Sequence, residues 1–196
     1  MHEETSLTVG RVNRVLTERV KPAIHSARMP LEISAHQLPG EPIAPADGLA
    51  LEYEPFTAGS MWGPAWGTTW FRMRGTVPAE WAGKQVEALV DLGFDVNMTG
   101  FQCEALAYLA SDSGPVPLKS LNPRNQWLPV DAAPGEAVEF YLEGASNPVL
   151  LDYHPFLPTP EGDIQTSSPS RCTGCGTWTW RCSSPTSSSS RSTWRC

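Results

Sequence analysis

The residues that could carry out chemistry are few and scattered in this 196-residue chain. The four histidines are widely separated, and none is paired with a carboxylate motif of the kind that binds a divalent metal. They are His2, His25, His36 and His154. Asp91 and Asp95 flank a Gly-Phe pair and are the nearest approach to a carboxylate pair. We expect them at a strand end and turn, where aspartate side chains bond local backbone amides.

The cysteines offer one candidate metal site, which the sequence argues against. Cys172-Thr-Gly-Cys175 has the spacing of half a tetrahedral zinc site, but no second pair accompanies it, only Cys182 and Cys196 far apart. Cys103 lies alone in the rest of the chain and follows a strand alternation. We interpret it as a small buried apolar residue, and its isolation as typical of a cytosolic protein without disulfides.

The tail, residues 164–196, has a composition unlike that of a folded segment. From Thr166 to Cys196 it uses seven residue types and holds no aliphatic residue and no carboxylate. We consider the reading frame that starts one base earlier. In that frame the codon that spans Trp178 and Thr179 must encode Asp, because TGG followed by ACN contains GAC. The codon that spans Trp180 and Arg181 must encode Ala or Glu. When a codon is chosen for each tail residue from Pro169 onward, this frame translates to EPLYRLRDVDLAVFEPDVFELAVDLEV. That sequence has the apolar periodicity of a globular segment.

We therefore predict a frameshift near residues 163–169, so that the tail is not evolved protein. Residues 166–196 have no aliphatic side chains to offset their conformational entropy, and we expect the tail to be disordered.

The elements that position the remaining residues begin with a helix at 5–21. Its apolar stripe predicts a helix docked on the core, which Pro22 should stop or kink. A proline-rich connection follows. Beyond it, period-two alternation and turn signals predict six strands and no further helix. These are 49–54, 68–77, 85–92, 101–110, 126–130 and 136–144.

This order predicts a mainly β fold, an antiparallel β-sandwich of the jelly-roll, galactose-binding-like type. Residues 1–30 form the N-terminal helical segment, 31–163 the sandwich and 164–196 the tail.

Charge and hydropathy exclude several partners. The net charge is −7, and the tail holds four arginines and no acid, so the remainder carries −11. This sign argues against nucleic acid and anionic membranes. No apolar run is long enough to span a bilayer, and the Met-His-Glu-Glu start lacks the features of a signal peptide. We expect a cytoplasmic protein.

The tryptophan-rich stretch 62–77 is the most distinctive part of the sequence. Trp62, Trp66 and Trp70 stand four apart and lead into the alternation Thr69-Trp-Phe-Arg-Met-Arg74. Aromatic faces could stack on sugar rings, or they could anchor the core or a domain interface. We favour the core for Trp66 and Trp70, and regard Trp62 as the best candidate for an exposed contact.

A second candidate contact is the polar turn Asn122-Pro-Arg124-Asn. It could face another domain or cap a loop. The candidates for sugar or domain-interface contact are thus Trp62, Trp66, Asn122 and Arg124.

The order of these motifs resembles a known family. Residues 62–77, then Val77-Pro through Gly93-Phe, then Gly100-Phe-Gln-Cys-Glu104, are similar to the N-terminal region of bacterial α-mannosidases of glycoside hydrolase family 38. The resemblance runs from about residue 8 to 163. It implies an accessory domain that precedes a catalytic domain, and we expect that catalytic domain to be missing from this chain.

The family hydrolyses terminal α-D-mannose with an Asp nucleophile, an acid/base carboxyl and a divalent metal, usually zinc. No such residue of the family can be carried over onto a position here, so we expect no catalytic residue, metal site or cofactor in this chain. The mannoside partner and the zinc belong to the parent enzyme, and the family's tetrameric members suggest a homo-oligomer. Two alternatives remain open, a freestanding carbohydrate-binding module and a purely structural sandwich.

Overall fold

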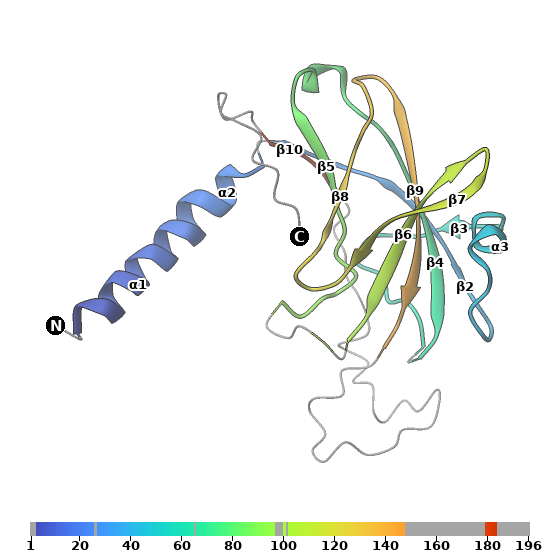
Figure 1. Ribbon diagram of the computed structural model, residues 1–196, viewed down its shortest axis with the longest axis horizontal. Helices are drawn as coiled ribbons and strands as arrows, with labels where there is room; N and C mark the ends of the chain where they lie inside the picture. The colour runs from blue at the N-terminus through green and yellow to red at the C-terminus, as the bar shows by residue number, and fades with distance from the viewer. Residues whose placement is uncertain are drawn as a thin grey trace, which may run out of the picture.

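Two antiparallel sheets form a sandwich from which a helical rod extends (Figure 1). The computed structural model describes residues 3–25, 27–64, 66–96, 100, 102–147 and 179–183. Every strand pairing in these ranges is antiparallel, and the prediction of an antiparallel β-sandwich preceded by a helix is confirmed.

The larger sheet has six strands in the order β3-β2-β4-β9-β6-β7. Its strands are β2 (Glu32–Gln37), β3 (Glu54–Pro55), β4 (Thr68–Thr76), β6 (Glu104–Ser111), β7 (Gly114–Leu121) and β9 (Ala137–Ala145). The central pair is β4 with β9, in register from Thr68↔Ala145 to Thr76↔Ala137. The alternation in 69–74 places Phe71 and Met73 toward the other sheet, where both are buried.

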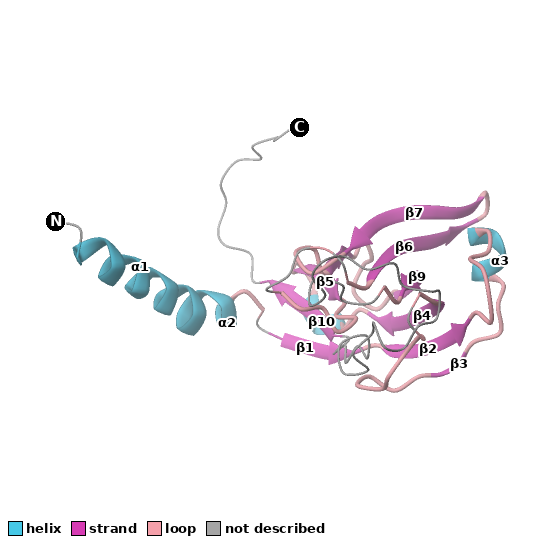
Figure 2. Ribbon diagram, turned by 90° about the horizontal axis from the view of Figure 1, so that it is seen from below, coloured by secondary structure: helices cyan, strands magenta, loops and turns pink. Residues whose placement is uncertain are grey.

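The smaller sheet has four strands in the order β1-β10-β5-β8. Its strands are β1 (Ala27–Pro30), β5 (Gln85–Leu89), β8 (Trp127–Pro129) and β10 (Thr179–Ser183), and a short 3-10 turn, η2 (Ala79–Trp81), precedes β5. Val86 and Ala88 of β5 and Leu128 of β8 are buried against the larger sheet. Figure 2 shows β1, β10 and β5 lying side by side in one layer.

The outer face of the larger sheet carries a second cluster of buried residues beneath a short helix, α3 (Pro45–Leu49). Trp70 is fully buried there, and its ring stacks on Tyr108 with centroids 5.6 Å apart. Gly48 of α3 lies against the indole so closely that a Cβ would overlap the ring. Trp70 is therefore a core anchor, as its alternation in the sequence predicted.

The strand predictions were correct for β4, β5, β6, β8 and β9 and wrong or incomplete elsewhere. Residues 49–54 do not form a strand: Pro45 begins α3, since proline suits the first turn of a helix, and only Glu54–Pro55 pairs. β7 was missed because Pro115 and Pro117 disguise it. Proline is tolerated there because β7 is an edge strand. β1 and β2 were not predicted. β1 falls in the range predicted as helical, and β2 lies in the proline-rich segment that follows it.

The N-terminal rod differs from the docked helix that the sequence predicted. It comprises α1 (Glu3–Val15), the π-helical segment η1 (Leu16–Val20) and α2 (Lys21–Ala23). The rod ends at Ala23, one residue after Pro22, and its hydrogen-bonding pattern is already altered in the preceding segment η1, which agrees with the predicted effect of Pro22. The apolar stripe faces solvent, with Leu7 63% exposed and Val12 59% exposed. Within the described residues, no helix combines the length and apolar character needed to cross a bilayer.

The tail contributes one described element. The sequence predicted disorder over 164–196, whereas Thr179–Ser183 pairs with β1 on one side and β5 on the other. In this segment Trp180 and Cys182 alternate with polar residues, a strand pattern that an argument from composition alone overlooks. The rest of the tail lies outside the described residues.

Candidate functional site

The predicted contact residues lie at one end of the sandwich, where β4 begins and β7 and β9 end. The loop that enters β4 is fastened there by Ser146. The Trp66 N–H donates to the Ser146 carbonyl at 3.0 Å, the Ser146 N–H donates to the Gly67 carbonyl at 3.0 Å, and the Ser146 hydroxyl donates to the Pro64 carbonyl. Gly63 has φ +70°, and a Cβ there would collide with Ser146. These contacts tie Gly63, Pro64, Trp66 and Gly67 to the end of β9.

Trp62 is not the exposed contact that the sequence suggested. It is only 5% exposed, its ring meets Phe71 edge-on at 5.3 Å, and its indole N–H donates to the Leu92 carbonyl at 3.0 Å. The sequence could not show this, because the covering partner lies 30 residues away in another loop. A tryptophan buried on both faces offers no platform for a sugar ring.

Trp66 is the most unusual residue of this loop. It has φ +65°, a left-handed conformation that a bulky side chain adopts only when its surroundings compel it. It is half-buried, and its indole Nε1 is buried without a hydrogen-bond partner. The strain is held by the backbone hydrogen bonds to Ser146. Trp66 thus stays a candidate contact at the end of the sandwich.

Asn122 and Arg124 form a tight turn between β7 and β8. The Asn122 side-chain oxygen accepts the Arg124 N–H at 3.0 Å, and Asn125 donates to the Ser120 carbonyl at 2.7 Å. This turn shares its end of the sheet with Trp66. However, β9 and β6 lie between the strands that carry them, a separation of about 14 Å at the usual strand spacing. The structure therefore does not bring the four predicted contacts into one site.

Asp91 and Cys103 have the structural roles that the sequence predicted. The Asp91 carboxylate accepts the Gly93 and Phe94 amides at 2.9 and 3.0 Å, which closes the turn after β5. Cys103 is buried, with its thiol 3.7 Å from the Leu92 carbonyl. Among the described residues, no three His, Cys, Asp or Glu side chains gather where they could hold a metal ion.

The larger sheet carries a charged cluster on its outer face that sequence reasoning did not propose as a site. Glu139 of β9 accepts hydrogen bonds from Arg72 at 2.6 Å and from Arg74 at 2.7 Å, both on β4. Its second oxygen accepts the Tyr141 hydroxyl at 3.0 Å, and the Arg72 guanidinium lies 5.7 Å from the Tyr141 ring centroid. The signal was present in the alternation of Arg72 and Arg74 with buried residues.

An open groove of about 550 Å³ runs beside this cluster, lined by Pro30, Glu32, Arg74, Gly75, Thr76, Ala137, Val138 and Glu139. The Glu139 hydrogen bond raises the pKa of Arg74 above its usual value. The groove thus presents an ion pair, Arg74 with Glu139, beside the further carboxylate of Glu32.

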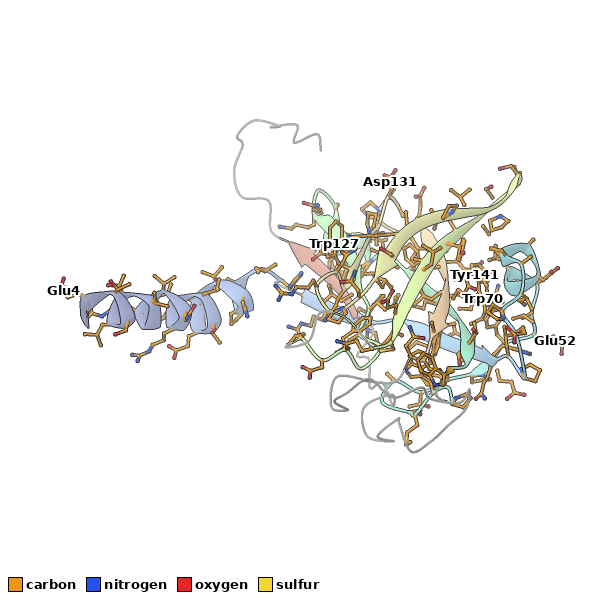
Figure 3. The ribbon with its side chains drawn as sticks, turned by 60° about the horizontal axis from the view of Figure 1, so that its bottom comes forward. Glu4, Glu52, Trp70, Trp127, Asp131 and Tyr141 are labelled. Carbon is orange, nitrogen blue, oxygen red and sulfur yellow. The ribbon has the colours of Figure 1, made fainter. Side chains whose placement is uncertain are left out.

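The tyrosines of this face are neutral hydrogen-bond donors. Burial, with the neighbouring Glu143, raises the pKa of Tyr108 to about 12, and its hydroxyl donates to Glu143 at 3.1 Å. Burial and the hydrogen bond to Glu139 raise the pKa of Tyr141 to about 12. Figure 3 shows Trp70 and Tyr141 close together near α3, on the opposite side of the sandwich from Trp127.

Trp127 on β8 is the exposed tryptophan of the described residues, at 42%. The Lys119 ammonium lies 3.0 Å from the centroid of its ring and covers one face. Partial burial lowers the pKa of Lys119. The pair is a cation–π contact that joins β7 of one sheet to β8 of the other.

A match to one protein family agrees with this architecture. The profile of one family, described as the Ams1-like α-mannosidase jelly roll domain, matches residues 29–168. The fold is similar to β-glucuronidase from Ruminococcus gnavus with D-glucuronic acid, at 14% identity and TM-score 0.46, covering 83% of this chain and 30% of that chain. The same enzyme with uronic deoxynojirimycin gives 14% identity and TM-score 0.48, covering 81% and 29%. None of the curated protein sequences compared with the chain matches it.

Proposed function

We propose that this chain, which belongs to the family of α-mannosidase jelly-roll domains, serves as the N-terminal accessory domain of an enzyme that hydrolyses terminal α-D-mannose residues. The observation that carries the proposal is the family match over residues 29–168, which spans nearly all the described strands. The chain spans about 30% of the length of the similar solved structures, so the catalytic step is assigned to the parent enzyme.

In this proposal the parent is a glycoside hydrolase of family 38, and its catalytic domain supplies the two carboxyls and the zinc. A retaining glycosidase needs carboxyl groups about 5–5.5 Å apart across the scissile bond. The described residues offer no substitute, because Asp91 is held by backbone amides and Glu139 by two arginines. The proposal therefore assigns no catalytic role to the described residues, and we expect the chain alone to be an inactive accessory domain.

A structural role fits the described residues better than sugar binding. Trp62 and Trp70 are buried, and Lys119 covers one face of Trp127. Flat aromatic faces open to solvent are what a pyranose platform would need. In this role the charged groove beside Arg74 and Glu139 faces the rest of the parent enzyme, and mannosides reach the parent rather than this domain.

The frameshift belongs to the same proposal. The family match ends at Ser168, inside the interval 163–169 where the composition of the chain changes. We place the parent enzyme in the cytoplasm in this account, since Cys103 is the sole cysteine before the tail.

Activity on a nitrophenyl α-mannoside tests the proposal, with the chain as encoded and the frame-restored gene product measured side by side. We expect nitrophenol release only from the restored product, in the presence of zinc or cobalt. Turnover by the chain as encoded, abolished by one substitution in it, would overturn the accessory role. An inactive restored product would contradict the assignment to an α-mannosidase.

A further inference from the structure

The position between β1 and β5 is where the tail meets the sandwich. β10 fills it, with Trp180 in register with Ala88 and Cys182 in register with Val86. Ala88 is fully buried and Val86 is 7% exposed, while Gln85 is exposed and Glu87 and Leu89 are half-buried. Residues in register on antiparallel strands share a face of the sheet. Positions 180 and 182 therefore belong to the face that covers the core.

The genetic code limits what the restored frame can place there. Every Trp and Cys codon begins with TG, and any base followed by TG encodes Met, Leu or Val. Read one base back, the codons that begin in Thr179 and Arg181 therefore encode an apolar residue, whatever codons the gene uses. The codon between them is Ala or Glu, and the codon before them is Asp. The restored segment thus has a Met, Leu or Val at every second position, preceded by Asp and separated by Ala or Glu, without any choice of codons.

The register of β10 with β5 distinguishes two mutations that could have shifted the reading frame, a one-base deletion and a two-base insertion. If one base was deleted, the two obligatory apolar residues stand at positions 180 and 182, opposite Ala88 and Val86. If two bases were inserted, they stand at 179 and 181, opposite Leu89 and Glu87. Only the deletion matches apolar residues to the buried positions of β5.

We infer that the position between β1 and β5 belongs to the strand encoded by the restored frame, and that the frame was lost by deletion of one base. The encoded tail occupies the same position because the same two TG dinucleotides specify Trp180 and Cys182 in one frame and Met, Leu or Val in the other. Both frames therefore place non-polar residues at positions 180 and 182. The inference extends the frameshift of the proposed function. It adds that the shifted product still completes its smaller sheet.

The restored strand should fit better than the encoded one. Arg181 stands in register with Arg28 of β1, and like charges directly opposite each other destabilise a strand pair. In the restored frame that arginine gives way to alanine or glutamate. Leucine or valine at positions 180 and 182 also suits the pleated inner face.

Hydrogen exchange on the full chain tests the inference with two matched variants. The restored variant carries Thr179→Asp, Trp180→Leu, Arg181→Ala, Cys182→Val and Ser183→Phe. The inverted variant places the same five residues with the alternation reversed, as Thr179→Leu, Trp180→Asp, Arg181→Val, Cys182→Ala and Ser183→Phe. The amides of β5 report on the pairing, and those of β4 serve as the internal reference.

We expect β5 amides of the restored variant to exchange at least as slowly as in the chain as encoded, and those of the inverted variant about tenfold faster or more. Equal protection in both variants, or loss of protection in the restored one, would overturn the inference. Complete unfolding of the inverted variant alone also supports it. The gene sequence decides the deletion separately: an unbroken frame would refute the frameshift, while the exchange result would still decide which residues β10 needs.

Discussion

The two sheets of the sandwich differ in how they are completed. All six strands of the larger sheet lie between Glu32 and Ala145, within the family match. Its inner face is packed in the core, and a second buried cluster beneath α3 covers part of its outer face. The smaller sheet has its buried face toward the core and takes one of its inner strands from Thr179–Ser183. If the frame shifts after residue 163, as we propose, the larger sheet keeps all of its strands, whereas the smaller sheet depends on whether the shifted tail can form a strand.

Truncation of Phe71 should lower the stability of the protein most, because Phe71 belongs to the larger sheet, all of whose strands lie before the tail. Phe71 is 1% exposed and its ring meets both Trp62 and Phe56 edge-on. We expect Phe71→Ala to lower the free energy of unfolding by about 4 kcal/mol, measured by urea denaturation. Leu128→Ala in the smaller sheet is the comparison. A larger loss for Leu128→Ala would reverse the proposed ranking of the layers.

Gly48 tests whether the outer cover of the larger sheet is as closely packed as its core. A Cβ at this position would overlap the indole of Trp70, so α3 would have to lift from the sheet. We expect Gly48→Ala to cost about 2 kcal/mol. Gly10→Ala is the matched control, since nothing lies near Gly10 and α1 should tolerate or gain from alanine. Equal behaviour of the two variants would mean that α3 is loosely attached.

Alkaline pH should weaken the larger sheet through its buried tyrosines. The pKa of Tyr108 and of Tyr141 is raised to about 12 from an ordinary value of 10.0. Between those values the unfolded chain loses protons that the folded protein keeps, so the free energy of unfolding falls as pH rises from about 10 toward 12. Tyr108→Phe with Tyr141→Phe should flatten this fall. An unchanged slope in the double variant would show that other groups cause it.

The smallest effect is expected at the contact between the two sheets formed by Lys119 and Trp127. Loss of an exposed cation–π contact costs about 0.5 kcal/mol, and we expect Lys119→Ala and Trp127→Ala to show that coupling in a double-mutant cycle. Additive effects of the two substitutions would mean that the contact adds nothing to stability.

The sequence predicted the strands whose alternation is regular. β4 and β9 follow from alternate apolar residues, and Asp91 was placed correctly because its turn chemistry is local. β7 was hidden by Pro115 and Pro117, which only an edge position tolerates, and α3 by a short segment whose apolar residues resemble a strand.

The candidate contacts were harder to predict than the strands. Whether a tryptophan beside a turn is open or covered depends on what packs against it, and the partner of Trp62 comes from a loop 30 residues away. The alternation placed Arg72 and Arg74 on one face of β4, but their partner Glu139 lies more than 60 residues away in sequence, so the sequence did not show the cluster itself. The strain at Trp66 likewise arises from backbone hydrogen bonds to Ser146, which sequence spacing does not reveal.

The most direct test of the account is the DNA sequence from the codon of Asp163 to about a kilobase downstream. We predict a one-base deletion between the codons of Asp163 and Pro169, followed by an open frame into a metal-binding hydrolase domain. A frame that runs unbroken through the tail, with no α-mannosidase frame downstream of it, would contradict the account.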